Sequence, residues 1–449
     1  MTLAFHPDET SPLVDALLAD LEVAPGTLER AIDARDEMLG FLAEAWEGDR
    51  EQALFQYFRT GASLAGSLSQ VLRWRFGDLD RIGRLLDFAS GYGRVTRFLV
   101  REVPPERVWV ADVYAGGVQF QEERLGVRGI VSTVRPEEFS CGERFDAILV
   151  TSLFTHLPEE RFVAWLRVLM GLLAPGGLLA FSAHSPELLP PGAGMPAGGC
   201  RFEETSESGS LDPGDYGSTW VTEEFVRDAL ERAAGPGASL HRIERGLCNF
   251  QDLYLAVPEP GVDFSSLCFH GEPQLSLEGA RLAADGRLRL EGWAAVRSGA
   301  VRAVEAVLDG ARLGSTPVDA PRTDVAERMG ERYLCTGWLW LGEIPPGASR
   351  SRSVLLLRVV DARGVGHPLW AGSLEMALLA SWRNEAARLE RGLGHAEAVL
   401  AEERARAAAE AEALRARIAA MQASRFWKLR NAWFRFKRLL GVVEEFEEI

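Results

Sequence analysis

The chain has 449 residues, of which 47% are hydrophobic and 25% charged, a composition typical of a globular protein with two to three folded units. Acidic residues outnumber basic ones by 65 to 49, and the formal net charge of −16 repels a phosphate backbone, so we expect no nucleic-acid partner. The five cysteines include no Cys-x-x-Cys pair, which argues against a zinc site, and we expect no bound metal.

Residues 1–80 are predicted to form a helical region. Leucines at helical spacing indicate a first helix, and a second apolar run follows at residues 53–58. We expect Gly61 to interrupt this second helix, because glycine favours helix ends and breaks. The leucines of the first helix are Leu13, Leu17, Leu18 and Leu21.

Residues 81–258 alternate short apolar runs of strand type with helical stretches. This alternation predicts an α/β domain with a doubly wound, mostly parallel sheet. Sheets of this kind bind ligands beyond the carboxyl ends of their strands, near the point where the strand order reverses. The predicted strands are residues 84–88, 108–111, 129–131, 145–150 and 178–181, with a turn at 172–177 before the last of them.

A glycine loop lies between the first strand and the following helix. Its glycines let the backbone approach a ligand closely and present amide groups at a helix N-terminus. Asp87 ends the first strand and Asp112 ends the second, where an acid can accept both hydroxyls of a ribose. The residues of the loop are Ala89, Ser90, Gly91, Tyr92 and Gly93.

The alternative for such a loop is a dinucleotide site. In that pattern a third glycine packs the helix on the strand, but Thr96 stands at its place. Asp87 would also repel a pyrophosphate, whereas it suits the cationic amino group and sulfonium of S-adenosylmethionine. The loop therefore favours S-adenosylmethionine over a dinucleotide.

Four motifs in this order resemble those of the class I S-adenosylmethionine-dependent methyltransferases, over about residues 55–257. They are residues 87–94, Asp112, residues 144–150, and residues 172–177, which resemble the turn written L-x-P-G-G. The resemblance implies a Rossmann-like sheet of seven strands, with a late antiparallel pair at residues 242–247 and 252–257 and with Thr222 as the N-cap of the helix before it. It implies S-adenosylmethionine as cofactor, bound by Asp87, Ala89, Ser90, Gly91, Tyr92, Gly93, Asp112, Val113, Thr151 and Ser152.

The sequence departs from this family at two places. Ala89 stands where the family usually has its first glycine, and we expect a negative φ angle there, which an alanine tolerates. Residues 134–136, Val-Arg-Pro, replace the acidic or polar residue that often contacts adenine in the family.

Two histidines follow predicted strands and are candidates for a catalytic base. His156 comes after the fourth strand and His184 after the fifth, and an imidazole can take a proton from a hydroxyl near neutral pH. An alternative role for His156 is to brace the following helix. Residues 151–154 lack the Asn/Asp-Pro-Pro-aromatic signature of amino and nucleic-acid base methylation, which favours an oxygen acceptor. Residues 185–220 are rich in Gly, Pro and Glu, as in a disordered insertion or a substrate lid.

Residues 262–372 are predicted to form a small antiparallel β-sandwich. Apolar residues alternate along short segments, and Asp309-Gly310 is a two-residue hairpin signal. We expect the alternating Trp338 and Trp340 to be core residues, with a sugar-stacking face as the alternative. The segment resembles a small sandwich domain attached to bacterial glycosyltransferases and glycan-modifying methyltransferases.

Residues 374–441 are predicted to be a helical tail. Leu389, Leu393, Ala396 and Leu400 follow a coiled-coil spacing that resumes after a stutter, which predicts self-association, with a solvated single helix as the alternative. Residues 425–438 contain six cations, five aromatic residues and no acid. A basic aromatic helix over residues 425–440 suits an anionic membrane surface or a protein partner, and docking onto the acidic body of the chain is the alternative.

Together these features predict a methyltransferase that methylates a hydroxyl of a glycan or of a lipid-linked saccharide. We expect it in the cytoplasm, at the inner face of the membrane, because residues 1–10 do not form a signal peptide and no apolar run could span a bilayer. The alternatives are an inactive methyltransferase fold that serves as a scaffold, and an enzyme that methylates a small molecule or a protein.

Overall fold

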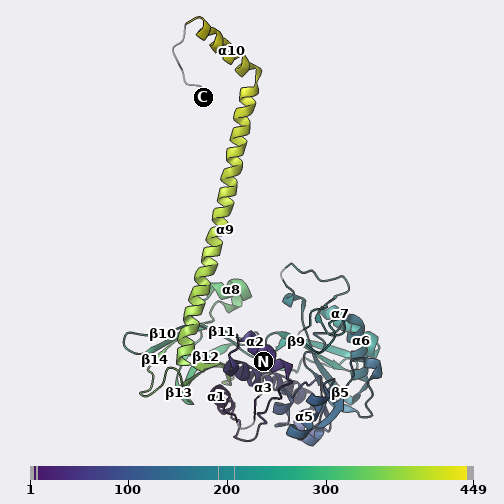
Figure 1. Cartoon of the computed structure of the whole chain (residues 1–449). Helices are drawn as coiled ribbons and strands as arrows, with labels where there is room; N and C mark the ends of the chain where they lie inside the picture. Colours follow the sequence, from purple (N-terminus) through teal and green to yellow (C-terminus); the bar gives the residue numbers. More distant parts are fainter. Residues whose placement is uncertain (1–4, 7–8, 191, 207, 442–449) are drawn as a thin grey trace. The chain divides into compact units, whose positions relative to one another are not determined.

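The computed structural model describes residues 5–6, 9–190, 192–206 and 208–441 (Figure 1). The chain divides into two compact units, Met1–Ser381 and Trp382–Ile449. Within the first unit lie the N-terminal helices, a seven-stranded sheet and three smaller antiparallel sheets. The boundaries predicted at residues 80, 258 and 372 stay predictions.

Three helices open the chain: α1 (Pro12–Asp20), α2 (Glu37–Ala45) and α3 (Arg50–Phe76). Each has a side-chain N-cap, since Ser11, Asp36 and Asp49 accept hydrogen bonds from backbone amides of the first turn. The predicted break at Gly61 is wrong, because α3 runs through it. A Cβ atom at Gly61 would lie 2.4 Å from the carbonyl oxygen of Arg94, so the glycine permits a close approach rather than a break.

The large sheet has the order β3-β2-β1-β4-β5-β9-β8. All neighbours pair in parallel except β5–β9 and β9–β8, which confirms the predicted fold and its antiparallel edge. The strand order reverses between β1 and β4, which is where a doubly wound sheet places its ligand. The strands are β1 (Leu85–Phe88), β2 (Val108–Asp112), β3 (Arg128–Val131), β4 (Phe145–Val150), β5 (Leu173–Ala183), β8 (Ser239–Leu247) and β9 (Gln251–Val257).

Helices cover both faces of this sheet. Apolar side chains of α6 and α7 share one buried core with it, while those of α1 to α3 share the core on the other face. Thr222 caps α7, as the resemblance implied, by accepting from the amide of Phe225 at 3.2 Å. The helices between the strands are α4 (Thr96–Leu99), α5 (Ala115–Leu125), α6 (Glu159–Gly171) and α7 (Glu223–Ala234). Short 3-10 helices lie at Leu79–Arg81, Pro105–Arg107, Pro136–Glu138, Pro186–Leu188 and Glu331–Tyr333.

The turn predicted at residues 172–177 is already part of a strand. β5 begins at Leu173, and its pairing with β4 jumps from Phe145–Leu173 to Ala147–Leu178. The extra residues form a bulge in which Gly176 has a φ angle of 77°. The amide of Gly176 donates to Glu259 at 2.8 Å, so tertiary hydrogen bonding holds the bulge inside the strand.

Residues 274–373 form the predicted sandwich. One sheet contains β10 (Gln274–Leu282), β11 (Leu288–Ala295) and β14 (Gly337–Gly342), and the other contains β12 (Val301–Leu308), β13 (Ala311–Pro317), β15 (Val354–Asp361) and β16 (Gly366–Ser373). Trp338 and Trp340 are buried in the core between them, as expected. Asp309 and Gly310 have φ angles of 49° and 79°, as the predicted hairpin turn requires. The helix α8 (Thr323–Met329) lies between β13 and β14 in the chain.

The sandwich packs against the N-terminal helices, which the sequence did not predict. The side-chain amide of Gln52 in α3 donates to the carbonyl oxygen of Ala371 in β16 at 2.6 Å. Arg358 of β15 forms an ion pair with Asp20 of α1 at 3.1 Å. Leu356 and Ala371 belong to the same buried core as α1, α3 and the large sheet.

The tail consists of α9 (Leu374–Ala423) and α10 (Arg425–Leu439), separated at Ser424. The side chains of Leu389, Leu393 and Leu400 are exposed in their unit, and that of Ala396 lies outside the described part, so the coiled coil stays a prediction. None of the described helices is both long and apolar enough to cross a membrane.

Candidate functional site

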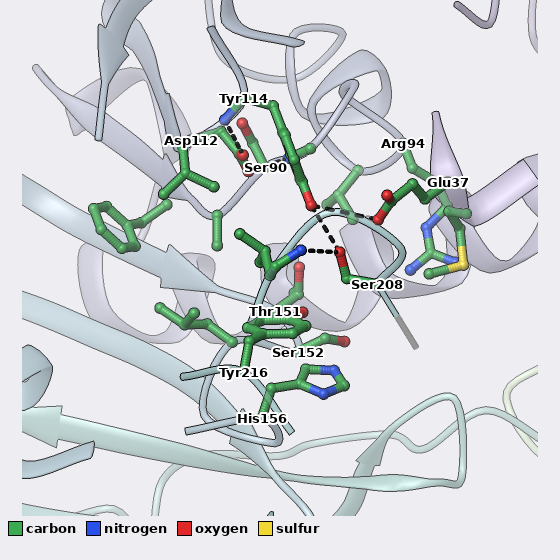
Figure 2. A pocket seen from close by; sticks show the side chains of 18 of the residues that line it. Glu37, Ser90, Arg94, Asp112, Tyr114, Thr151, Ser152, His156, Ser208 and Tyr216 are labelled. Carbon is green, nitrogen blue, oxygen red and sulfur yellow. Dashed lines mark hydrogen bonds between the residues drawn. The ribbon is translucent and has the colours of Figure 1, made fainter. Parts of the chain in front are cut away.

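A cavity of about 670 Å³ lies beyond the carboxyl ends of β1, β2, β4 and β5. Figure 2 shows part of its wall, with Ser90, Asp112, Thr151 and His156 among the residues that face it. Of the predicted site residues, Gly93 alone is not in the wall. Those that line the cavity are Asp87, Ala89, Ser90, Gly91, Tyr92, Asp112, Val113, Thr151, Ser152, His156 and His184.

Asp87 places a buried carboxylate at the end of β1. Its side chain is 1% exposed, and its Oδ2 atom lies 2.7 Å from the hydroxyl of Thr96. Its Oδ1 atom is buried and has no hydrogen-bond partner among the described residues. Burial raises the pKa of Asp87 to about 7, and the charge of Asp112 adds to the effect. A buried carboxylate with an unpaired oxygen is a favourable contact for a cation.

The proton of Thr96 shows which form Asp87 takes without a ligand. The Thr96 hydroxyl lies 2.8 Å from Oε1 of Gln121 as well as 2.7 Å from Asp87. Gln121 is held in this orientation because its amide nitrogen donates to the carbonyl oxygen of Gly91 at 2.9 Å. One hydroxyl proton cannot serve two acceptors, so both contacts are satisfied when Asp87 is protonated and donates to Thr96.

The loop from Ala89 to Gly93 turns by left-handed backbone conformations. Ala89 has a φ angle of 59°, so the prediction of a negative angle is wrong. The angle lets the amide of Ala89 donate to the carbonyl oxygen of Ala111 in β2 at 2.7 Å. Gly93 has φ of 78°, and a Cβ atom there would lie 2.9 Å from Gln121. Gly93 thus supports the loop by close packing, although it does not line the cavity.

Asp112 connects the end of β2 to the loop. Its Oδ2 atom accepts from the amide of Gly91 at 2.7 Å and its Oδ1 atom from that of Tyr114 at 2.9 Å. Burial raises its pKa, which the hydrogen bonds from these amides oppose. Because each carboxylate oxygen has two lone pairs, the same atoms can also accept ribose hydroxyls. Nearby, the buried hydroxyl of Ser132 lines the cavity without a partner in the described part of the chain.

The segment predicted as an insertion or a lid contains an ordered hairpin, β6 (Cys200–Glu203) and β7 (Ser218–Val221), while residues 191 and 207 lie outside the described residues. Its tip contacts the cavity wall, since the hydroxyl of Tyr114 lies 3.0 Å from that of Ser208 (Figure 2). The hydroxyl of Tyr114 also lies 2.8 Å from that of Ser210. Ser210 also donates to Glu37 of α2 at 3.1 Å. The segment therefore joins the end of β2 to the N-terminal helices.

His156 is fixed by this segment. Its Nδ1 atom donates to the carbonyl oxygen of Gly217 at 2.7 Å, because a carbonyl can only accept. Its ring stacks on Tyr216, with centroids 4.3 Å apart (Figure 2). The neutral ring consequently carries its proton on Nδ1, and Nε2 is the nitrogen that can take another. His156 braces the hairpin segment, rather than the helix named in the alternative.

His184 lies at the end of β5 between two aromatic rings. Its centroid is 5.2 Å from that of Phe250 and 6.2 Å from that of Trp220. Neither ring nitrogen has a hydrogen-bond partner among the residues described, and both are buried. Burial lowers the pKa of His184 to about 4, so the ring is neutral at physiological pH. A neutral imidazole with an unsatisfied acceptor can bind a hydroxyl proton.

The N-terminal region also lines the cavity, through Arg35 in the turn before α2, Glu37 of α2 and Thr60 of α3 among others. No local motif marks these residues, because they reach the site only through tertiary packing. Arg94 likewise lines the cavity, where its guanidinium lies 3.4 Å from the hydroxyl of Thr60. Arg94 ends the first motif, whose pattern gives no sign of this contact.

A buried arginine holds the N-terminal segment on the glycine loop. Arg97 is 0% exposed and donates to the carbonyl oxygens of Gly93 at 3.0 Å and of Ala31 at 3.0 Å. Its guanidinium lies 5.2 Å from the ring of Tyr57, whose hydroxyl donates to Asp36 at 2.6 Å. Within the described residues, no group of His, Cys, Asp or Glu side chains is arranged to hold a metal ion.

Comparisons with known proteins found a family match and several similar solved structures. A sequence family described as "Methyltransferase domain" matches residues 85–177, and no curated protein matches the chain. Solved structures similar to the chain include DesVI of Streptomyces venezuelae, with 17% identity, 49% of this chain and 98% of that chain covered, and a TM-score of 0.35. They also include CalS10, an amino pentose methyltransferase from Micromonospora echinaspora, with 20% identity, 43% of this chain and 89% of that chain covered, and a TM-score of 0.33.

A further solved structure is that of a S-adenosylmethionine-dependent methyltransferase from Clostridium acetobutylicum. It has 12% identity, 51% of this chain and 100% of that chain covered, and a TM-score of 0.35. At TM-scores this low, the structural similarities carry no information about the acceptor. The family match supports a methyltransferase domain and S-adenosylmethionine as its cofactor. Residues 85–177 thus match a methyltransferase domain, and they lie in the Rossmann-like sheet that the four motifs predicted.

Proposed function

We propose that the chain transfers a methyl group from S-adenosylmethionine to a hydroxyl of a glycan or of a lipid-linked saccharide. The observation that carries the proposal is the unpaired, buried Oδ1 atom of Asp87 in a cavity that also contains His184. The first group suits the cationic donor and the second suits a hydroxyl acceptor, so one cavity offers both contacts that the reaction needs.

On the donor side, Asp87 is placed to face the cationic part of S-adenosylmethionine, and Asp112 to accept the ribose hydroxyls. Ser132 directly follows β3, and its hydroxyl has no partner among the described residues. We assign this hydroxyl the contact with the adenine that Val134 cannot make. S-adenosylmethionine supplies an electrophilic methyl group on a sulfonium. Its transfer is an in-line displacement, so positioning of the two substrates provides most of the rate.

On the acceptor side, His184 takes the proton from the acceptor hydroxyl as the new carbon–oxygen bond forms and the carbon–sulfur bond breaks. It suits this role by position, because its nitrogens line the cavity and are unpaired among the described residues, although the lowered pKa makes the ring a weak base. Trp220 and Phe250 flank the ring and offer apolar faces against which a sugar can pack. His156 is the second candidate base, through Nε2, and its ring is fixed by Gly217 and Tyr216.

The test uses the full chain, because the contacts between α3 and the sandwich would be broken in a shorter fragment. Calorimetry should detect binding of S-adenosylmethionine, and a labelled methyl group should pass to a component of saccharide extracts. His184→Asn should slow transfer by about 100-fold to 10,000-fold at unchanged donor affinity. His241→Asn is the matched control, since His241 stacks on Phe264 and does not line the cavity.

Absence of donor binding by the full chain would refute the proposal as a whole. Transfer to a small molecule or a protein instead of a saccharide would keep the methyltransferase and change the acceptor. Donor binding without transfer to any of the three acceptor classes would favour the scaffold alternative. If His184→Asn transferred at the normal rate and His156→Gln did not, His156 would be the base.

A further inference from the structure

The helix α10 differs in charge from the rest of the chain. Its 15 residues contain six cations and no acid. Because the whole chain has a formal charge of −16, the residues outside α10 carry −22. Ser424 separates α10 from α9 and caps it, since its hydroxyl oxygen accepts from the amide of Trp427 at 3.2 Å. α10 is thus a distinct helix with its own start (Figure 1).

Apolar side chains follow one stripe of α10 and the residue after it, at spacings of three and four. Every member of this stripe is exposed within its unit, from 53% for Phe436 to 76% for Phe426. A stripe this apolar is costly to leave in water, so it implies a surface that covers it. Its members are Phe426, Leu429, Trp433, Phe436 and Leu440.

The cations of α10 are arranged in two ways. A second stripe of the helix contains Lys428, Arg435 and Arg438, and Asn431 completes its spacings of three and four. Arg430 and Lys437 lie nearer the aromatic residues, and each is placed over a ring. The guanidinium of Arg430 is 4.5 Å from the ring of Trp427, and the ammonium of Lys437 is 5.6 Å from that of Trp433.

We propose that α10 docks the protein on an anionic lipid surface, lying in the plane of the headgroups. The stripe from Phe426 to Leu440 enters the boundary with the acyl chains, and the cations contact lipid phosphates. Tryptophan beside lysine and arginine is typical of this boundary, where aromatic rings and long cationic side chains reach both phases. A protein groove would need to match six cations distributed around the helix, whereas a lipid surface offers anions on every side of the stripe.

The experiment measures sedimentation of the full chain with vesicles of phosphatidylcholine that contain about one third phosphatidylglycerol. We expect binding that weakens as salt is raised, and little binding to phosphatidylcholine alone. A triple variant with Lys428→Gln, Arg435→Gln and Arg438→Gln should bind about 100-fold more weakly, at about fivefold for each cation. A double variant with Trp433→Ala and Phe436→Ala should bind at least about tenfold more weakly.

The matched control removes three exposed cations from α9, through Arg404→Gln, Arg415→Gln and Arg417→Gln, and should bind as the unchanged chain does. Glutamine keeps α10 helical, because it is a good helix former. Donor affinity, measured by calorimetry, should be the same in all variants, which separates this proposal from the proposed function. The proposal is overturned if the unchanged chain does not bind the anionic vesicles, or if the α10 variants bind no more weakly than the control.

Discussion

The two halves of the cavity are built in different ways. The donor half comes from the ends of consecutive strands, and it is held together by short hydrogen bonds, one between Thr96 and Asp87 and one that the amide of Gly91 donates to Asp112. The acceptor half comes from segments far apart in the sequence, and neither ring nitrogen of His184 in it has a hydrogen-bond partner among the described residues. A tightly bonded half suits a ligand of constant structure, and a half with unsatisfied groups leaves the acceptor to complete the site.

This difference also explains what the sequence could predict. Asp87, the glycine loop and Asp112 lie at strand ends within 25 residues, so local patterns locate them and predict the donor. Glu37 of α2, Thr60 of α3 and Arg94 in the turn before α4 reach the cavity through tertiary packing, for which no local pattern exists. The φ angle of Ala89 and the unbroken course of α3 at Gly61 likewise depend on neighbours in space, namely Ala111 and Arg94.

The largest effect is expected at Arg97, which ties the glycine loop of the donor half to the N-terminal segment. Replacing Arg97 by methionine should lower the free energy of unfolding by about 3 kcal/mol. The variant leaves the carbonyl oxygen of Ala31 without its side-chain donor and removes one of the two cations near the buried Asp36, of which Arg94 remains. Urea unfolding measures the change. Arg101→Met, at an exposed position four residues away, should cost less than about 0.5 kcal/mol, and a similar cost for both variants would contradict the role of Arg97.

The donor half is tested through Asp112. Asp112→Asn should weaken binding of S-adenosylhomocysteine by about 1–3 kcal/mol, because the ribose hydroxyls lose a charged acceptor. Since Asp112 also accepts from Gly91 and Tyr114, a loss could arise from the loop alone. Calorimetry with a 2′-deoxy analogue separates the causes. If Asp112 contacts the ribose, the binding free energy that the variant loses with the 2′-deoxy analogue should be smaller than the sum of the two separate losses. Strict additivity of the two losses would exclude the contact.

The protonation of Asp87 predicts a pH dependence that belongs to the donor half alone. Its pKa of about 7 lies above that of an ordinary aspartate, so the folded protein retains a proton that the unfolded chain releases. Without a ligand, the contribution of Asp87 to stability is therefore present at low pH and is lost as the pH rises through about 7.

A cationic donor prefers the ionised form of Asp87, so donor affinity should rise with pH up to about 7 and level off above it. The increase is about tenfold, or 1.4 kcal/mol, for each pH unit well below that pKa. Calorimetry in two buffers of different ionisation enthalpy should show proton release on binding at pH 6. Asp87→Asn should abolish the dependence, and the exposed Asp228→Asn should retain it. A pH-independent affinity in the unchanged chain would show that Asp87 does not meet the cation.

The smallest effect concerns the irregular residue of the loop. Ala89→Gly should stabilise the protein by about 0.5 kcal/mol, because relief of a left-handed alanine, worth about 1–2 kcal/mol, is offset by about 0.5–1 kcal/mol of backbone entropy. The control Ala164→Gly, in the right-handed helix α6, should destabilise it by about 1 kcal/mol. Urea unfolding measures both. Destabilisation by Ala89→Gly would mean that the methyl group of Ala89 makes stabilising contacts in the cavity wall.

The packing of the sandwich on α1 and α3 bears on any attempt to recombine this protein. Gln52 and Ala371 are 319 residues apart, yet they share a buried hydrogen bond beside a core that continues into the large sheet. A chimera cut near residue 258 would carry away one wall of that core and leave Gln52 without its partner. Transplanting residues 85–177 to another protein therefore requires both flanking segments. For an engineer, the segments of the first compact unit are best moved together.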